Sequence, residues 1–104
     1  MSITVALEDL GDEVAMRGPG YLLTTVADGR PHVMHLQFGV DGSTLTTEIG
    51  RSAARNIGAQ SAVTLLWPPT EHGGYSLIVD GTATVENESA AVIEAVSAVL
   101  HRPA

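Results

Sequence analysis

The chain of 104 residues contains no cysteine and no lysine, and its aromatic residues are one Trp, two Tyr and one Phe. Without cysteine, neither a disulfide framework nor a thiolate metal site can form. No apolar run approaches the roughly 20 residues that a membrane-spanning helix requires, so we expect no membrane insertion. No basic-then-apolar signal segment opens the sequence, and we expect a cytoplasmic protein.

Positive charge is also scarce. Five arginines face twelve acidic residues, for a net charge of -7. Such a chain repels a phosphate backbone and has no basic stripe, so we expect no nucleic-acid partner. Against this background Arg51 and Arg55 are conspicuous, because an acidic protein that holds an anionic ligand must concentrate its few cations.

The length and composition indicate one globular domain spanning residues 1–104. Hydrophobic residues make up 44% of the chain and charged residues only 16%, and no linker or repeat divides it. A chain of this size buries about two-thirds of its unfolded surface around a single core.

The first half is predicted to be a short helix followed by a meander. Apolar residues recur at helical spacing from Leu7 to Met16, and Gly18-Pro19-Gly20 ends that pattern. Two Asp-Gly turns, which are typical of tight hairpins, then separate three strand candidates. These are Tyr21 to Val26, Pro31 to Val40 and Thr44 to Glu48.

The second half is predicted to hold a short helix and further strands. The alanine-rich segment Ser52 to Gln60 favours helix, and Ser61 to Trp67 alternates as a buried strand. Tyr75 to Val85 reads as one long strand with a bulge or bend at its glycine. For Ser89 to Leu100, alanine content favours helix, whereas the turn before it favours a returning strand.

This order of elements, together with five short sequence segments, resembles the pyridoxamine 5′-phosphate oxidase-like family over about residues 18 to 102. The segments are Gly29-Arg30-Pro31-His32-Val33, Asp41-Gly42, Arg51-Ser52-Ala53-Ala54-Arg55-Asn56-Ile57, Ala62-Val63-Thr64-Leu65 and Gly74-Tyr75-Ser76-Leu77-Ile78-Val79-Asp80-Gly81. The resemblance implies a mainly β fold, an antiparallel six-stranded split barrel with a short N-terminal helix and a short helix after the third meander strand. It also favours a closing strand from Ala90 to Val96.

The resemblance further implies a homodimer that holds FMN, or the related 5-deazaflavin coenzyme, in clefts between its subunits. In many relatives a Ser or Arg, and a Lys two residues later, grip the cofactor phosphate. Arg51 matches the first position here, but Ala53 stands at the second. We expect Arg55 to replace the lysine, because residues four apart share one helix face.

The candidate cofactor contacts are therefore Arg51, Ser52 and Arg55 at a strand-to-helix junction, where free N–H groups and guanidinium forks favour an anion. Thr46 and Thr47 end the preceding strand, and the Asn56 amide follows in the helix. The strand from Pro31 to Phe38 is expected to run along the flavin ring.

Two less polar positions complete the candidate set. His32 lies on the strand expected beside the ring, and Trp67 is a candidate to stack on a planar cofactor, although a lone tryptophan more often closes a core. The four histidines lack ligand spacing, so we expect no metal site.

Two functions follow. The first is an FMN- or deazaflavin-dependent oxidoreductase acting on a small molecule, in which the cofactor carries the hydride chemistry. The second is a non-enzymatic split-barrel dimer that binds another planar ligand such as haem, or no cofactor, and its basis is Ala53 in place of the lysine.

Overall fold

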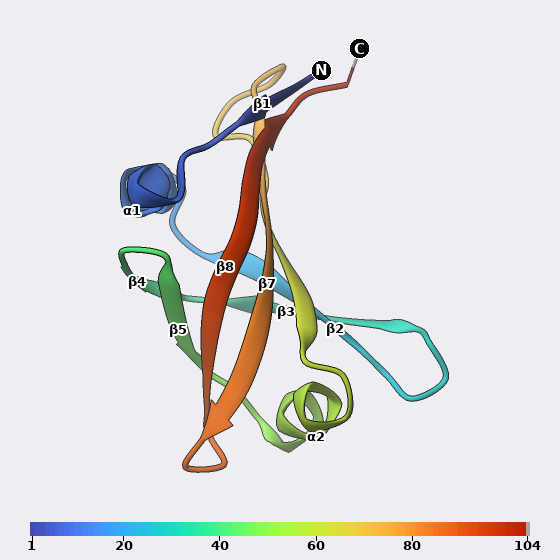
Figure 1. Ribbon diagram of the computed structural model, residues 1–104. Coiled ribbons are helices and arrows are strands. Elements are labelled where there is room, and N and C mark those ends of the chain that lie inside the picture. The colour runs from blue at the N-terminus through green and yellow to red at the C-terminus, as the bar shows by residue number, and fades with distance from the viewer. Residues whose placement is uncertain (104) are drawn as a thin grey trace.

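The computed structural model describes residues 1–103, in which eight antiparallel strands form one curled sheet (Figure 1). The sheet order is β3-β2-β6-β7-β8-β5-β4, and β1 pairs with β8. The strands are β1 (Ser2–Thr4), β2 (Gly20–Thr25), β3 (Pro31–Leu36), β4 (Gly39–Asp41), β5 (Thr44–Glu48), β6 (Ala62–Trp67), β7 (Ser76–Glu86) and β8 (Ala90–His101).

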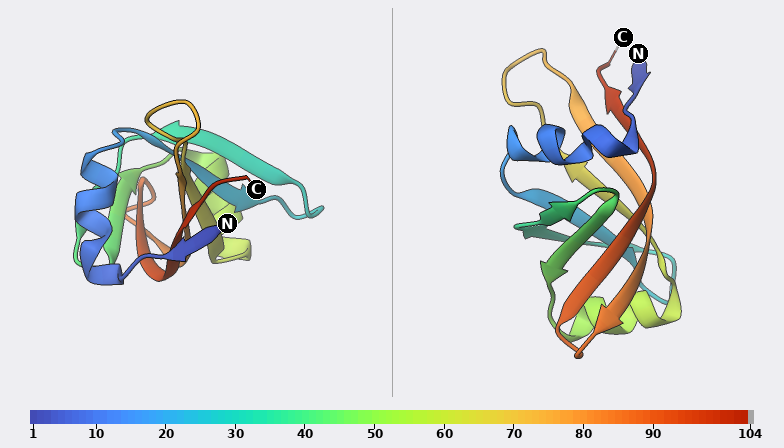
Figure 2. Two further views of the ribbon diagram at one scale, coloured as in Figure 1. Left: turned by 90° about the horizontal axis from the view of Figure 1, so that it is seen from above. Right: turned by 60° about the vertical axis from the view of Figure 1, so that its left-hand side comes forward.

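The expected six-stranded split barrel is confirmed: β2, β3, β5, β6, β7 and β8 are its main strands, and β1 and β4 are additions of three residues each. The sheet curls around the core, and the β2–β3 hairpin projects from its side (Figure 2). At the expected Asp-Gly turns, Gly29 has φ 91° and Gly42 has φ 62°, values that favour glycine.

Two predicted strands differ in extent from the observed ones. The segment from Pro31 to Val40 is divided into β3 and β4, because the side chain of Phe38 turns into the core between them. The closing segment is a strand, as the resemblance favoured, but it continues from Ala90 to His101 because β7 pairs with it along that whole length.

The predicted bend at the glycine of β7 is present. The β7–β8 register shifts between Asp80 and Gly81, which pair with Ser97 and Ala95 and leave Val96 as the extra residue of a bulge. A Cβ atom at Gly81 would lie 2.8 Å from the backbone oxygen of Glu94. Only glycine allows the two strands to approach this closely.

Two helices cover the ends of the curled sheet. A 3₁₀ turn (Leu7–Asp9) leads into α1 (Leu10–Ala15), and α2 (Arg51–Ala59) lies at the opposite, lower end (Figure 1). Each helix buries apolar side chains in the common core, whose largest member is the fully buried Trp67.

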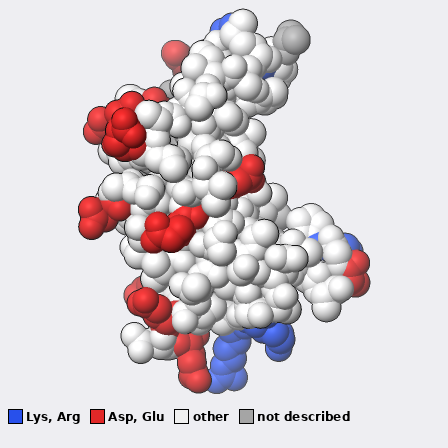
Figure 3. Space-filling view, in the orientation of Figure 1, with Lys and Arg blue, Asp and Glu red and all other residues white. Residues whose placement is uncertain are grey.

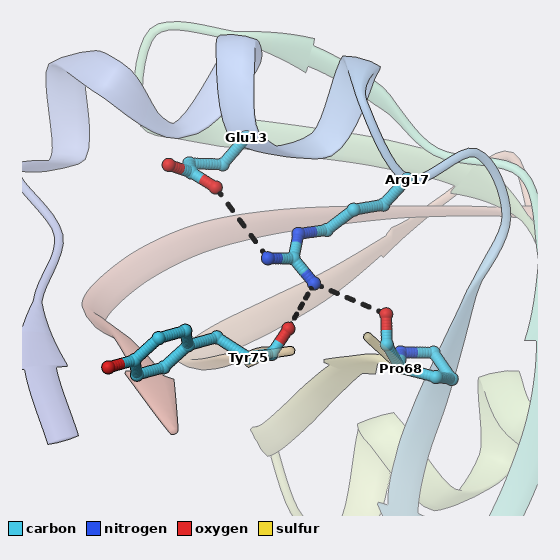
Figure 4. Close-up of polar contacts among 4 residues, drawn as sticks. All are labelled: Glu13, Arg17, Pro68 and Tyr75. Carbon is cyan, nitrogen blue, oxygen red and sulfur yellow. Dashed lines mark hydrogen bonds and ion pairs between the residues drawn. The ribbon is translucent and has the colours of Figure 1, made fainter. Parts of the chain in front are cut away.

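Arg17 fastens α1 to the loop between β6 and β7 (Figure 4). Its Nη1 donates to the carbonyl oxygens of Pro68 at 3.2 Å and Tyr75 at 2.7 Å. Its Nη2 lies 3.8 Å from Glu13, and only 9% of the side chain is exposed. This arginine is therefore part of the fold rather than of a ligand site.

The outer face of the sheet carries a row of apolar side chains. Strand pairing joins Tyr21 to Leu66, Leu66 to Ile78, and Ile78 to Val99, and cross-strand partners share a face. Val33, which pairs with Leu23 in the next row, is 52% exposed, and Val96 is 66% exposed. We call this surface the outer face.

Candidate functional site

The two conspicuous arginines lie together on α2. The helix begins at Arg51, after an extended Gly50, and its alanines allow one face to pack closely. Ala53, Asn56 and Ile57 are buried, whereas Arg51, Ser52 and Arg55 are exposed on the other side. Residues four apart lie on one helix face, so Arg51 and Arg55 extend from the same side of α2.

The other three arginines already have partners. Arg17 is buried as described, and the Arg102 guanidinium lies 4.7 Å from the centre of the Tyr75 ring. Arg30 binds Asp28 in the β2–β3 hairpin, with Nη2 2.7 Å from the carboxylate. The Arg30 side chain, and then its backbone N–H, hold the pKa of the Asp28 carboxyl below its ordinary value.

Among residues 1–103, Arg51 and Arg55 form no ion pair, and their one side-chain hydrogen bond runs from Arg55 Nη2 to Ser52 Oγ in the same helix, at 3.5 Å. Figure 3 shows basic side chains gathered at the lower end of the molecule, over α2. The cations that the fold does not use are therefore concentrated in one place.

The start of α2 adds backbone donors to these cations. Gly50 provides no side-chain cap, so the first N–H groups of the helix are free to meet a ligand. The positive end of the helix dipole also favours an anion there. With Ser52 Oγ, this set of donors fits a phosphate group.

A groove lies beside β5, the strand that leads into α2. It encloses about 550 Å³ and is lined by Leu36, Gln37, Thr46, Thr47, Glu48 and Ala90. Thr46 is exposed, whereas Thr47 is buried and its Oγ1 donates to the Gln37 carbonyl oxygen at 2.8 Å. Thr47 thus ties β5 to the segment that follows β3.

Asn56 and His32 lie on the inner side of the sheet and do not line this groove. The Asn56 Nδ2 donates to Thr24 Oγ1 at 3.2 Å, which links α2 to β2. His32 pairs with Thr24 across β2 and β3, and its Nδ1 is buried with no hydrogen-bond partner among the described residues.

Trp67 requires a correction, because it is not available to stack on a cofactor. Its side chain is fully buried, and its Nε1 donates to the Gly18 carbonyl oxygen at 3.0 Å. The edge of the Phe38 ring meets it, with 5.3 Å between ring centres. The protein itself covers the indole.

The missing lysine has a structural explanation. Ala53 is 1% exposed and packs in the core, so its position faces away from the solvent side of α2. Burying an unpaired ammonium group there would be costly. Arg55 is the residue that carries a charge on the same face as Arg51.

No protein-family model matches the chain. Two uncharacterised proteins, from Mycobacterium bovis and Mycobacterium tuberculosis, are each 35% identical to it, in an alignment that covers 83% of this chain and 72% of theirs. The chain belongs to one family with these two proteins.

Solved structures identify the fold. A Listeria innocua protein provisionally named a pyridoxamine 5′-phosphate oxidase has a TM-score of 0.64 at 21% identity, over 85% of this chain and 93% of its own. The chain has the pyridoxamine 5′-phosphate oxidase-like split-barrel fold. An F₄₂₀ reductase has a TM-score of 0.61 at 21% identity, over 85% of this chain and 88% of its own. The haem storage protein of Vibrio cholerae has a TM-score of 0.70 at 16% identity, over 94% of this chain and 96% of its own.

Four groove residues, Leu36, Gln37, Glu48 and Ala90, are absent from the candidate residues derived from the sequence, although the first two lie in the strand expected along the ring. Glu48 follows Thr47 directly, so its position at the end of a strand was a usable signal. Ala90 enters the groove through its pairing with Glu48 across β5 and β8. No local pattern indicates such a contact.

Within residues 1–103, no three His, Asp or Glu side chains lie together as a metal site requires. No helix in that range is long and apolar enough to cross a membrane.

Proposed function

We propose that this split barrel is a flavin- or deazaflavin-dependent oxidoreductase that acts on a small molecule as a homodimer. One observation supports the proposal: the two arginines with no ion pair among residues 1–103 share one face at the start of α2, which begins shortly after Glu48, a residue that lines an open groove. Arginine forks and free helix N–H groups are the donors that a phosphate prefers.

In this proposal Arg51, Ser52 and Arg55 bind the cofactor phosphate. Thr46 supplies an exposed hydroxyl to the groove, and Thr47 holds the groove wall through its bond to Gln37. The bound cofactor supplies the hydride chemistry, while the protein supplies binding, orientation and electrostatics.

Asn56 and His32 act from the inner side. The Asn56 bond to Thr24 fixes α2 against β2 and so keeps the arginine face directed outward. His32 lies on β3, the strand proposed to run along the ring.

The homodimer is proposed to form through the outer face. Half-buried Tyr21, Leu66, Ile78 and Val99, together with exposed Val33 and Val96, contribute apolar surface there. Apolar patches of this kind mark association sites.

The test is a titration with FMN in which the quenching of flavin fluorescence measures binding. Arg51→Ala and Arg55→Ala should each weaken binding tenfold or more, about 1.4 kcal/mol. Arg30→Ala removes the same charge from the distant hairpin and is the matched control, since its partner is Asp28. Equal affinities for all four proteins, or no binding of either FMN or the 5-deazaflavin coenzyme by the unmodified chain, would refute the phosphate site.

A second candidate is a non-enzymatic dimer that binds haem, favoured by the similarity to the haem storage protein over 94% of this chain. A thermal-shift screen against FMN, a 5-deazaflavin coenzyme and haem separates the two, because a ligand that binds only the folded state raises the melting temperature. A shift with haem alone would favour storage.

A further inference from the structure

We propose that the groove accepts an uncharged or cationic substrate and rejects an anionic one, with Glu48 as the residue that sets this preference. This inference rests on the proposed function, because it assumes that the arginines of α2 are occupied by the cofactor phosphate. It concerns the second molecule in the reaction rather than the cofactor.

The first argument is the distribution of cations. The sequence has no lysine and five arginines. Arg17 and Arg30 are engaged with carbonyl or carboxylate groups, and Arg102 lies on the Tyr75 ring. Arg51 and Arg55 are the pair assigned to the phosphate. No further cationic side chain within residues 1–103 is left to bind a second anion.

The second argument is the lining of the groove itself. Leu36, Gln37, Thr46, Thr47 and Ala90 are neutral, and Glu48 is the one charged residue among the lining residues in the described chain. Glu48 is exposed, and residues 1–103 offer it no ion-pair partner. Its carboxylate therefore attracts a cation and repels an anion that enters the groove.

The third argument is the surface around the groove. Acidic side chains extend along the side where α1, β4 and β5 lie (Figure 3). Next to β5, Asp41 of β4 pairs with Thr44, and Glu94 of β8 accepts a hydrogen bond from the Thr44 hydroxyl. A surface of one sign raises the local concentration of ligands with the opposite charge and lowers that of ligands with its own.

The experiment uses three probes with one ring and three charges: nicotinamide (neutral), 1-methylnicotinamide (cationic) and nicotinate (anionic). Each is titrated into the FMN-loaded protein at neutral pH, and binding is followed by the flavin absorbance and by ligand-observed NMR. Nicotinate should bind at least tenfold more weakly than nicotinamide, and 1-methylnicotinamide should bind at least as tightly as nicotinamide. A higher salt concentration should reduce the difference in affinity between the charged probes, because it screens the charge of Glu48.

Variants identify the responsible residue. Glu48→Gln should reduce the difference between the charged probes several-fold, and Glu48→Lys should make nicotinate the tightest of the three. Glu71→Gln is the matched control, because it removes one exposed carboxylate from the distant β6–β7 loop and should leave the order unchanged. Thermal melts verify that each variant is folded.

The proposal is overturned if nicotinate binds the FMN-loaded protein as tightly as nicotinamide, if none of the three probes binds, or if Glu48→Gln acts no differently from Glu71→Gln. If FMN does not bind, the titrations are made with the protein loaded with the 5-deazaflavin coenzyme, and failure of both cofactors to bind refutes the proposed function and this inference with it. FMN binding followed by the wrong order of probes refutes this inference alone.

Discussion

The contact between Gly20 and Trp67 shows how single residues determine the core. A Cβ atom at Gly20 would lie 2.5 Å from Trp67 Cε2 and 2.6 Å from Nε1, closer than real atoms approach. The indole fits only because residue 20 has no side chain. The same close packing explains why the ring is unavailable to a ligand.

Gly20→Ala is therefore expected to destabilise the protein by about 1–3 kcal/mol, the usual cost of overpacking a core. Urea unfolding followed by tryptophan fluorescence measures the change. Gly58→Ala is the control, since nothing lies within 4 Å of that Cβ position and alanine favours helix by about 1 kcal/mol. If Gly20→Ala were as stable as Gly58→Ala, the contact would not limit the core.

At the residue scale, the sequence predicted which kinds of side chain suit a ligand better than it predicted whether each side chain points outward or into the core. The scarcity of cations identified Arg51 and Arg55, and both are exposed on α2. Asn56 and Trp67 were polar or aromatic enough to suit a ligand, but both point inward, because the path of the chain through the core determines their direction. The local amino-acid composition does not determine that path.

At the scale of elements, alternation and turn chemistry predicted most strands. Val63, Leu65 and Trp67 share the buried face of β6, as their spacing of two requires. The ambiguous segment after Ser89 is a strand despite its alanines, because β7, β5 and β1 all pair with it. Tertiary pairing outweighs a weak helix preference. The division of β3 from β4 depends on burial of Phe38, which no local pattern indicated.

The attachment of α1 provides a prediction at this scale. Arg17→Met removes the donor to the Pro68 and Tyr75 carbonyls and should cost about 1–3 kcal/mol, the penalty for unsatisfied buried groups. Glu13→Gln alters only the 3.8 Å ion pair and should cost less than about 1 kcal/mol. Urea denaturation of both variants gives the comparison. A larger loss in Glu13→Gln would mean that the ion pair, not the carbonyl contacts, holds α1.

At the scale of the whole molecule, the outer face is an apolar feature that the chain itself leaves partly uncovered, within residues 1–103. Its rows are assembled from strands distant in sequence, such as β2, β6 and β8. The sequence could supply the apolar residues but not their neighbours. Only the sheet order brings them together.

If two copies associate through this face, Val33→Asp and Val96→Asp should convert dimer to monomer, because each places an unpaired carboxylate in the contact. Light scattering coupled to gel filtration measures the mass. Met16→Asp is the control, since Met16 is 65% exposed near the end of α1. A dimer that survives both valine substitutions, or that is lost equally with Met16→Asp, would place the contact elsewhere.

The two ends of the described chain are held side by side. Ser2 pairs with His101, and the amino group of Met1 donates to the Arg102 carbonyl oxygen at 3.0 Å. Figure 1 places both ends at the pole away from α2. A fluorescent tag or a surface-immobilisation handle fused at either position would consequently project from the far pole, leaving the arginine pair open to incoming molecules during a sensor measurement.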